Sequence, residues 1–137
     1  ASIIKKASPE DIEKGKTMVI ITYGMGVYWA KEAANQFENR VEVIDLRTLF
    51  PLDEELIFER VKLHGKCLVL TEEQLNNSFA EALAHRISKN CFKHLDAPVE
   101  AMGSLNLPAV PINVELEKQM LPNPEKVAKK IEEILSF

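Results

Sequence analysis

Residues 41–53, VEVIDLRTLFPLD, pass from a strand pattern to the start of a helix. The first six residues are mostly β-branched and apolar, which is typical of a short buried strand. Asp45 and Arg47 stand at the carboxyl end of this strand, and a proline turn follows. Asp53 is a good N-cap for the next helix, whose first turn is acidic. Because ligands of open α/β sheets bind at the carboxyl ends of strands, this stretch predicts an α/β fold and the edge where a site would lie.

The same alternation of strand and helix patterns extends along the rest of the chain. Strands are expected over residues 17–22, 41–46, 67–71 and 98–102, and helices over 26–38, 53–63, 79–89 and 124–135. The strands are apolar throughout, which indicates burial on both faces, and the helices between them imply parallel crossovers. The sequence therefore predicts a three-layer α/β/α sandwich with a mostly parallel sheet of four to five strands. Ser2 to Lys6 is a candidate antiparallel edge strand.

The composition is that of an ordinary globular protein. The chain has 137 residues, 46% of them hydrophobic and 28% charged, which suits one domain with its own core. A net charge of −4 argues against nucleic acid as a partner, and apolar runs of strand length predict no membrane span. Cys67 and Cys91 are expected to be reduced core residues of a cytoplasmic protein. The chain starts at Ala1 without an initiator methionine, so we expect a fragment of something longer.

Gly24-Met25-Gly26, after the first buried strand, is the one motif with a dinucleotide-binding character. Asp45 lies at the expected distance for an acid that binds a ribose. However, Trp29 stands where the third glycine of that motif lets the helix approach the strand. The alternative is a tight turn between strand and helix, in which glycine relieves steric strain. The turn is the favoured interpretation.

Other catalytic patterns are missing from the sequence. The three histidines share no metal-ligand spacing: His64 flanks a helix end, and His85 is expected at the surface or in an interface. There is no nucleophile elbow and no phosphate-binding loop. Glu72 and Glu73, at a strand end, suit either an acid/base pair or hydrogen-bond acceptors. We therefore predict no catalytic, cofactor-binding or metal-binding residue in this chain.

Five residues remain as structural or interface candidates: Asp45, Arg47, Phe50, Asp53 and Glu72. We expect Arg47 to donate charge-assisted hydrogen bonds to acceptors near the strand ends, such as Glu72. Phe50, in the loop before Pro51, is expected to contact a missing domain or a second subunit.

Short motifs spread over residues 17–137 carry a family resemblance. They are residues 20–24 (IITYG), 41–49 (VEVIDLRTL) with Pro51 and Asp53, 68–72 (LVLTE), 78–80 (SFA), 91–92 (CF), 95–99 (LDAPV), 104–105 (SL), Pro108, 116–117 (LE) and 121–122 (LP). In this order they resemble a transketolase C-terminal domain. More narrowly, they resemble the beta subunit of the thiamine-dependent decarboxylating component of 2-oxo acid dehydrogenase complexes, closest to the branched-chain type.

The resemblance implies a domain without its own active site. In such enzymes thiamine diphosphate and magnesium bind between two other domains, one of which carries a G-D-G…N motif that is absent here. The C-terminal domain is expected to form subunit contacts and to dock the small binding domain of the acyltransferase core. This chain departs from the family pattern at Ser78, where glycine is common, at Ala101, where arginine is usual, and at Asn106, where aspartate is usual. These departures weaken a charged contact around residues 98–110 but leave the fold intact.

Two hypotheses of different classes therefore compete. In the first, the chain is the assembly domain of a larger thiamine-dependent enzyme and carries no catalytic residue. In the second, it is a free-standing α/β nucleotide-binding or regulatory domain that uses the strand ends at Asp45 and Glu72. The abrupt start at Ala1 and the lack of a phosphate-binding loop favour the first.

Overall fold

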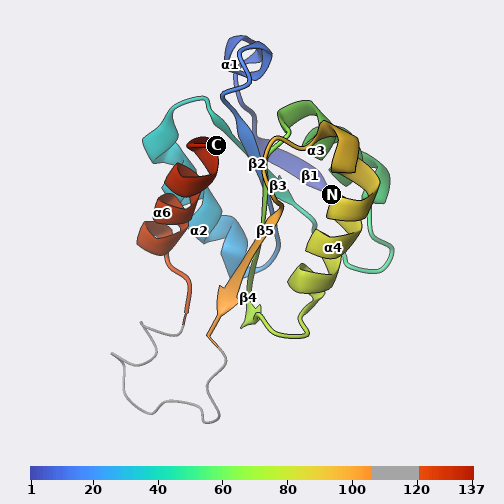
Figure 1. Cartoon of the computed structure of the whole chain (residues 1–137). Coiled ribbons are helices and arrows are strands. Elements are labelled where there is room, and N and C mark those ends of the chain that lie inside the picture. The colour runs from blue at the N-terminus through green and yellow to red at the C-terminus, as the bar shows by residue number, and fades with distance from the viewer. Residues whose placement is uncertain (106–120) are drawn as a thin grey trace.

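A twisted sheet of five strands, in the order β1-β3-β2-β4-β5, runs through the centre of the computed structural model (Figure 1). The model describes residues 1–105 and 121–137. The strands are β1 (Ser2–Lys5), β2 (Met18–Thr22), β3 (Val41–Asp45), β4 (Cys67–Gln74) and β5 (Glu100–Ser104). Strands β2 to β5 pair in parallel, and β1 pairs with β3 in the antiparallel sense. The predicted parallel sheet and its antiparallel edge strand are both confirmed.

Helices cover both faces of this sheet. One layer holds α2 (Met25–Ala34) and α6 (Pro124–Leu135), and the other holds α3 (Glu54–His64) and α4 (Phe79–Cys91) (Figure 1). The shorter elements are α1 (Pro9–Glu13) and two 3-10 turns, η1 (Asn35–Phe37) and η2 (Phe92–His94). The three-layer α/β/α sandwich expected from the sequence is therefore confirmed. Within the described residues, no helix is long and apolar enough to cross a membrane.

Each central strand supplies side chains to two separate cores. Ile20 of β2 packs with the α2 and α6 layer, while its neighbour Ile21 packs with the α3 and α4 layer, and both are fully buried. In β3, Val43 likewise packs with the α2 and α6 layer, and Ile44 packs with the α3 and α4 layer. Because successive side chains of a strand point to opposite faces, a strand covered on both faces must be apolar at every position. This burial explains the continuous apolar runs of the sequence.

The ends of the helices follow the local sequence signals. The Asp53 side chain accepts a hydrogen bond from the Leu56 backbone N–H at the start of α3. Ser78 does the same for α4, where its hydroxyl accepts from the Glu81 N–H at 3.2 Å. Gly65 ends α3 in the left-handed conformation with φ 73°, a geometry in which a side chain would be strained. Asp53 stands where the sequence predicts the start of a helix, and Ser78 and Gly65 lie within two residues of the ranges 79–89 and 53–63 that were expected to be helical.

Some element bounds differ from the prediction. Strand β4 continues to Gln74 instead of ending at residue 71, because after an irregularity it pairs again with β5. Gly103 permits this close pairing, since a Cβ atom at that position would lie 2.7 Å from the Glu73 carbonyl oxygen. Strand β5 accordingly spans Glu100–Ser104 rather than residues 98–102, α2 turns into η1 before residue 38, and the short α1 has no predicted counterpart.

Some sequence features fall outside the described part of the chain. Asn106, Pro108 and Pro111 are not among the described residues. Pro122, the last of the prolines in that stretch, is buried at the approach to α6.

Candidate functional site

The loop after β3 brings Asp45 and Arg47 together. One oxygen of the Asp45 carboxylate, Oδ1, accepts a hydrogen bond from the Arg47 backbone N–H at 3.0 Å. The other, Oδ2, lies 3.9 Å from Arg47 Nε. Arg47 has a φ of 61°, so Asp45 supports a left-handed turn that a non-glycine residue seldom adopts. The Arg47 side chain is 65% exposed.

The expected contact between Arg47 and Glu72 is therefore wrong. In the sheet, β2 lies between β3 and β4, so the two residues follow strands that are not neighbours. Arg47 pairs with Asp45 in its own loop instead. Phe50 and Asp53 belong to the same loop, in which Asp53 caps α3, whereas Glu72 lies on the far side of β2.

Strands β2 and β4 form the topological switch point of the sheet. From β2 the chain reaches β3 through α2 on one face, and from β3 it reaches β4 through α3 on the other. Ligands of open α/β sheets usually bind in the crevice at such a point. Here Tyr23 bridges the two strand ends: its hydroxyl lies 2.9 Å from Thr71 Oγ1, and its ring packs edge-on against Phe79 with centroids 6.0 Å apart. The pKa of Tyr23 is raised, chiefly by burial. The hydrogen bond with Thr71 lowers this pKa, whereas the nearby charges of Glu73 and Glu72 raise it further.

The glycine turn before α2 serves packing. A Cβ atom on Gly26 would lie 2.0 Å from Thr22 Oγ1, so only glycine lets the helix approach β2 so closely. Gly24, with φ 61°, stands at the N-cap position and offers no side chain to the helix end. Trp29 is only 8% exposed and belongs to the core under α2 and α6. This geometry supports the tight-turn interpretation.

The exposed Glu72 side chain lies close to the turn before α2. A Cβ atom on Gly24 would lie 3.0 Å from Glu72 Oε1, so the Glu72 carboxylate stands beside the amino end of α2. In a dinucleotide site the pyrophosphate binds at this helix end. The negative charge of Glu72 repels a phosphate and interacts favourably with the helix dipole. The structure thus gives Glu72 an electrostatic role at α2.

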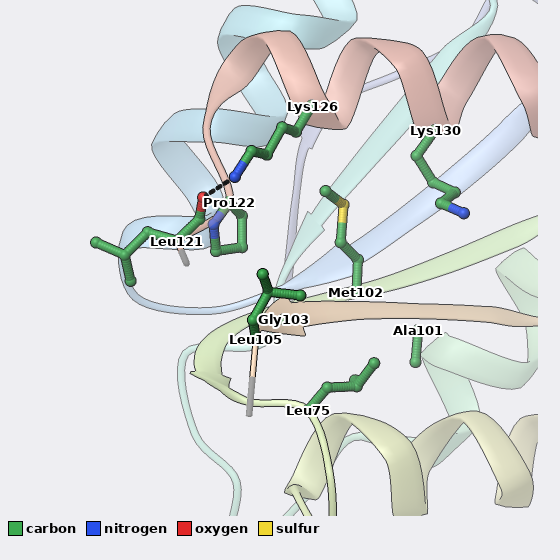
Figure 2. A pocket seen from close by; sticks show the side chains of 9 residues that line it. All are labelled: Leu75, Ala101, Met102, Gly103, Leu105, Leu121, Pro122, Lys126 and Lys130. Atoms are coloured by element: carbon green, nitrogen blue, oxygen red, sulfur yellow. Dashed lines mark hydrogen bonds between the residues drawn. The ribbon is translucent and has the colours of Figure 1, made fainter. Parts of the chain in front are cut away.

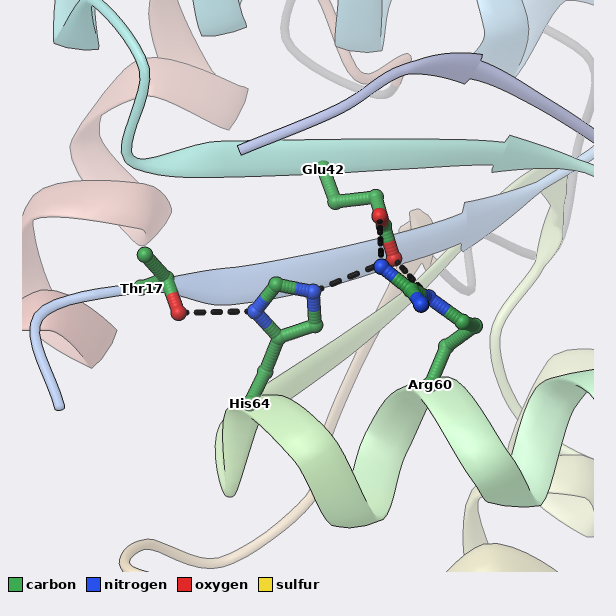
Figure 3. Close-up of polar contacts among 4 residues, drawn as sticks. All are labelled: Thr17, Glu42, Arg60 and His64. Carbon is green, nitrogen blue, oxygen red and sulfur yellow. Dashed lines mark hydrogen bonds and ion pairs between the residues drawn. The ribbon is translucent and has the colours of Figure 1, made fainter. Parts of the chain in front are cut away.

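A buried polar network links β3 with α3 and the start of β2 (Figure 3). Arg60 donates to both oxygens of the Glu42 carboxylate, from Nε at 2.8 Å and from Nη2 at 2.5 Å. His64 Nε2 lies 3.1 Å from Glu42 Oε2, and His64 Nδ1 lies 2.7 Å from Thr17 Oγ1. A carboxylate only accepts hydrogen bonds, so Nε2 is the donor and Nδ1 pairs with the Thr17 hydroxyl.

The charges of this network stabilise one another. Burial alone raises the pKa of the Glu42 carboxyl, but hydrogen bonds from His64 and Arg60 outweigh burial and hold that pKa below its usual value. The hydrogen bonds to Glu42 raise the pKa of Arg60. The Glu42 side chain has no exposed surface, so the ionised carboxylate depends on these partners.

The order Thr17, His64, Glu42 is that of a nucleophile, a base and an orienting acid. Burial excludes that chemistry, however, because Thr17 is 1% exposed and His64 2% exposed. No substrate can reach the hydroxyl, and the network therefore holds α3 on the sheet. The network was not predicted from the sequence. The signals were Glu42 inside an apolar strand, and Arg60 and His64 four residues apart on the buried side of a helix.

Shallow hollows lie on the described surface, and they include the following three. One, of about 390 Å³, lies between β5 and the start of α6 (Figure 2). Its lining is mainly aliphatic and includes Ala101, one of the departures from the family pattern. On its rim Lys126 donates to the Leu121 carbonyl at 3.0 Å, and Lys130 pairs with Glu133. The other two hollows measure about 460 and 520 Å³.

The described residues form no cluster suited to a metal ion. Within residues 1–105 and 121–137 no group of three or more His, Cys, Asp or Glu side chains is placed to hold a metal ion. His85 is exposed, as expected. Cys67 and Cys91 are free and buried, and burial raises the pKa of both thiols. Phe50, in contrast, is 90% exposed.

Comparison with known proteins identifies the family. The model of the transketolase C-terminal domain matches residues 9–127. The 2-oxoisovalerate dehydrogenase subunit beta of Bacillus subtilis is 36% identical over 127 residues, which are 90% of this chain and 39% of that protein. The pyruvate dehydrogenase E1 component subunit beta of Rickettsia felis is 32% identical over 129 residues, 92% of this chain and 39% of that protein.

Among solved structures, the fold matches a chain described as a split gene transketolase, inactive beta4 tetramer. The TM-score is 0.75 at 20% sequence identity, and the match covers 98% of this chain and 42% of the other. The chain thus spans about two fifths of the length of these relatives. With a matching family model over most of its length and the same fold, the chain belongs to the transketolase C-terminal domain family.

Proposed function

We propose that this chain is the C-terminal assembly domain of a thiamine-diphosphate-dependent 2-oxo acid dehydrogenase. The parent enzyme decarboxylates a 2-oxo acid oxidatively and passes the acyl group to lipoyl groups, while this domain mediates contacts and leaves catalysis to other domains. The observation that carries the proposal is the similarity, over about nine tenths of the chain, to beta subunits of two such dehydrogenases. Beta subunits of a 2-oxoisovalerate dehydrogenase and of a pyruvate dehydrogenase are each 36% identical to this chain, so the proposal names the substrate class, a 2-oxo acid.

The residues of the domain support a role in assembly. The triad-like network is buried, and Tyr23 bridges the switch point. Thiamine diphosphate needs a magnesium ion held by oxygen ligands and a site for its diphosphate. The described residues offer neither a cluster of metal ligands nor a free helix end at α2, where Glu72 stands. We therefore assign both cofactors to other domains of the parent.

The proposed partners are protein surfaces in the same complex. They are the remaining domains of the parent, a second beta subunit or its equivalent, and the subunit-binding domain of the acyltransferase core. The net charge of −4 makes nucleic acid an unsuitable partner. A cytoplasmic location fits the two reduced, buried cysteines.

Calorimetry on this chain separates the assembly domain from a nucleotide-binding domain. NAD, and thiamine diphosphate with magnesium, are titrated into the wild-type chain and into Asp45→Ala, with the exposed Glu13→Ala as the matched control. We expect no binding in the micromolar range, because Glu72 and Trp29 oppose a dinucleotide. Micromolar binding of NAD that is lost in Asp45→Ala but kept in Glu13→Ala would favour the nucleotide-binding alternative.

The parent activity is tested on the full-length protein encoded by the gene. We expect decarboxylation of a 2-oxo acid, with 2-oxoisovalerate and pyruvate as the substrates tested, measured together with the natural partner subunits. A full-length protein inactive with every 2-oxo acid would contradict the proposal.

A further inference from the structure

Phe50 stands out because its ring is exposed while its neighbours in the loop are anchored. The side chain is 90% exposed. Leu49 and Leu52, on either side of it, are half-buried and pack against the core under α3 and α4. The Thr48 hydroxyl donates to the Pro51 carbonyl at 3.0 Å, and this hydrogen bond spans the turn that contains Phe50. The loop therefore holds Phe50 outward in a preformed position.

The Arg47 guanidinium, in the same loop, has N–H donors that can bind a further acceptor. Its side chain is 65% exposed, and within the described residues its one ionic partner is Asp45, at 3.9 Å. A guanidinium has five N–H donors and pairs best with a carboxylate through two of them. Arg47 can therefore receive a second carboxylate from outside.

From this arrangement we propose that Phe50 and Arg47 dock together on a companion domain of the parent protein, in an apolar pocket with a carboxylate at its rim. The inference rests on the proposed function. Aromatic and arginine side chains supply most interface hot spots, and a preformed anchor loses little entropy on binding. A small ligand is a poor alternative, because small-molecule sites are concave and this loop presents a projecting ring.

The companion domain is a better occupant than a second copy of this chain. In the curated relatives, about three fifths of the length lies outside the matched region. This remaining part of the protein is large enough to form a domain that the Phe50 loop can contact. On this chain, a described hollow that combines large apolar side chains with a carboxylate is lined by Phe92, Val99 and Asp96, among others. It lies near the starts of β4 and β5, where Asp96 N–H binds the Gly65 carbonyl, at the opposite end of the sheet from the Phe50 loop. A second copy seated there would be held head to tail, which builds open chains unless the rotation closes.

Photo-crosslinking in the full-length parent identifies the occupant directly. p-Benzoylphenylalanine replaces Phe50 in one sample and, as a matched control, Phe92, which is 77% exposed near the opposite end of the sheet. We expect the probe at position 50 to link to residues of the same polypeptide outside this chain, close to an Asp or Glu. A link to a second copy of the 137 residues, or no link, would overturn the inference.

Hydrogen exchange gives a second readout. In Phe50→Asp, the amides of residues 47–52 of the parent should exchange at least about tenfold faster than in the wild type, because docking protects the loop. Arg47→Glu should give a smaller increase, and Phe92→Asp none. Unchanged exchange in Phe50→Asp would contradict the docking.

Activity separates the inference from the proposed function. A parent that is active with 2-oxo acids but has an unprotected, unlinked loop refutes the docking alone. A linked, protected loop in a parent without such activity refutes the proposed reaction alone.

Discussion

Replacing Glu42 with Gln should destabilise the protein strongly although the two side chains have nearly the same shape. The Glu42 carboxylate accepts from three donors, which are two N–H groups of Arg60 and one of His64, at 2.5 to 3.1 Å. An amide offers one acceptor oxygen and turns an NH₂ group toward the remaining donor. Because Glu42 has no exposed surface, water cannot satisfy that donor.

The size of the effect follows from burial. Removing one partner of a buried ion pair costs about 3–5 kcal/mol. The Arg60 side chain is 18% exposed and can partly reach water, so we expect the low end, about 3 kcal/mol. For a domain of this size that corresponds to a fall in Tm of about 10 °C. The double variant Glu42→Gln/Arg60→Met should lose less than the sum of the two single variants, since the pair is coupled.

The lowered pKa of Glu42 predicts in which direction the stability difference between wild type and Glu42→Gln changes with pH. The pKa of Glu42 in the folded protein lies below the ordinary value of 4.5, so the unfolded chain binds a proton more readily. The stabilisation is therefore fully present above the unfolded pKa and is lost as the pH falls through the folded pKa. The difference in unfolding free energy between wild type and Glu42→Gln should be constant near neutral pH and shrink below about pH 4.5.

Urea unfolding followed by circular dichroism at several pH values measures this difference. Glu132→Gln, an exposed acid on α6, is the matched control and should change stability little. An unchanged Tm in Glu42→Gln, or a difference that persists undiminished to pH 3, would refute the reasoning.

Three further outcomes are expected. Gly26→Ala should lower the free energy of unfolding by about 1–3 kcal/mol in urea titrations, because its Cβ atom would meet Thr22 Oγ1 at 2.0 Å; equal stability would show that α2 shifts freely. Arg47→Ala should leave the Tm of this chain nearly unchanged, because the Arg47 side chain is 65% exposed and its ion pair with Asp45, at 3.9 Å, contributes little to stability. A large fall in Tm would reveal a further contact of Arg47 within the chain. Cys67 and Cys91 should react with a thiol reagent at pH 8 only after unfolding, because burial raises both thiol pKa values; fast reaction of the native protein would contradict this.

The elements of the fold could be predicted because their signals are local. Continuous apolar runs indicate strands buried on both faces, and Asp53 indicates the start of a helix. The exposure of Phe50 also agrees with the expectation from its place in the loop before Pro51. Boundaries were less accurate where pairing decided them, as in β4, which extends because β5 returns to it.

The partners of the charged residues could not be predicted in the same way. Arg47 was expected to reach Glu72, but the sheet order places β2 between their strands. His64 was described only as flanking a helix end, yet it lies 2% exposed between Glu42 and Thr17. A pairing of this kind depends on which strands are neighbours and on how a helix is turned against them.

The sequence alone predicts the α/β class, the buried strands, most helix ends and the family resemblance. These features can be predicted because periodicity and capping depend on residues close together in the chain. The tertiary structure decided that the Glu42 carboxylate pairs with Arg60 and His64 and that the Glu72 side chain lies beside Gly24 at the start of α2. The physical reason is that a buried charge is tolerated only beside its partners. Those partners are 18 and 22 residues away along the chain and meet only when α3 packs on the sheet.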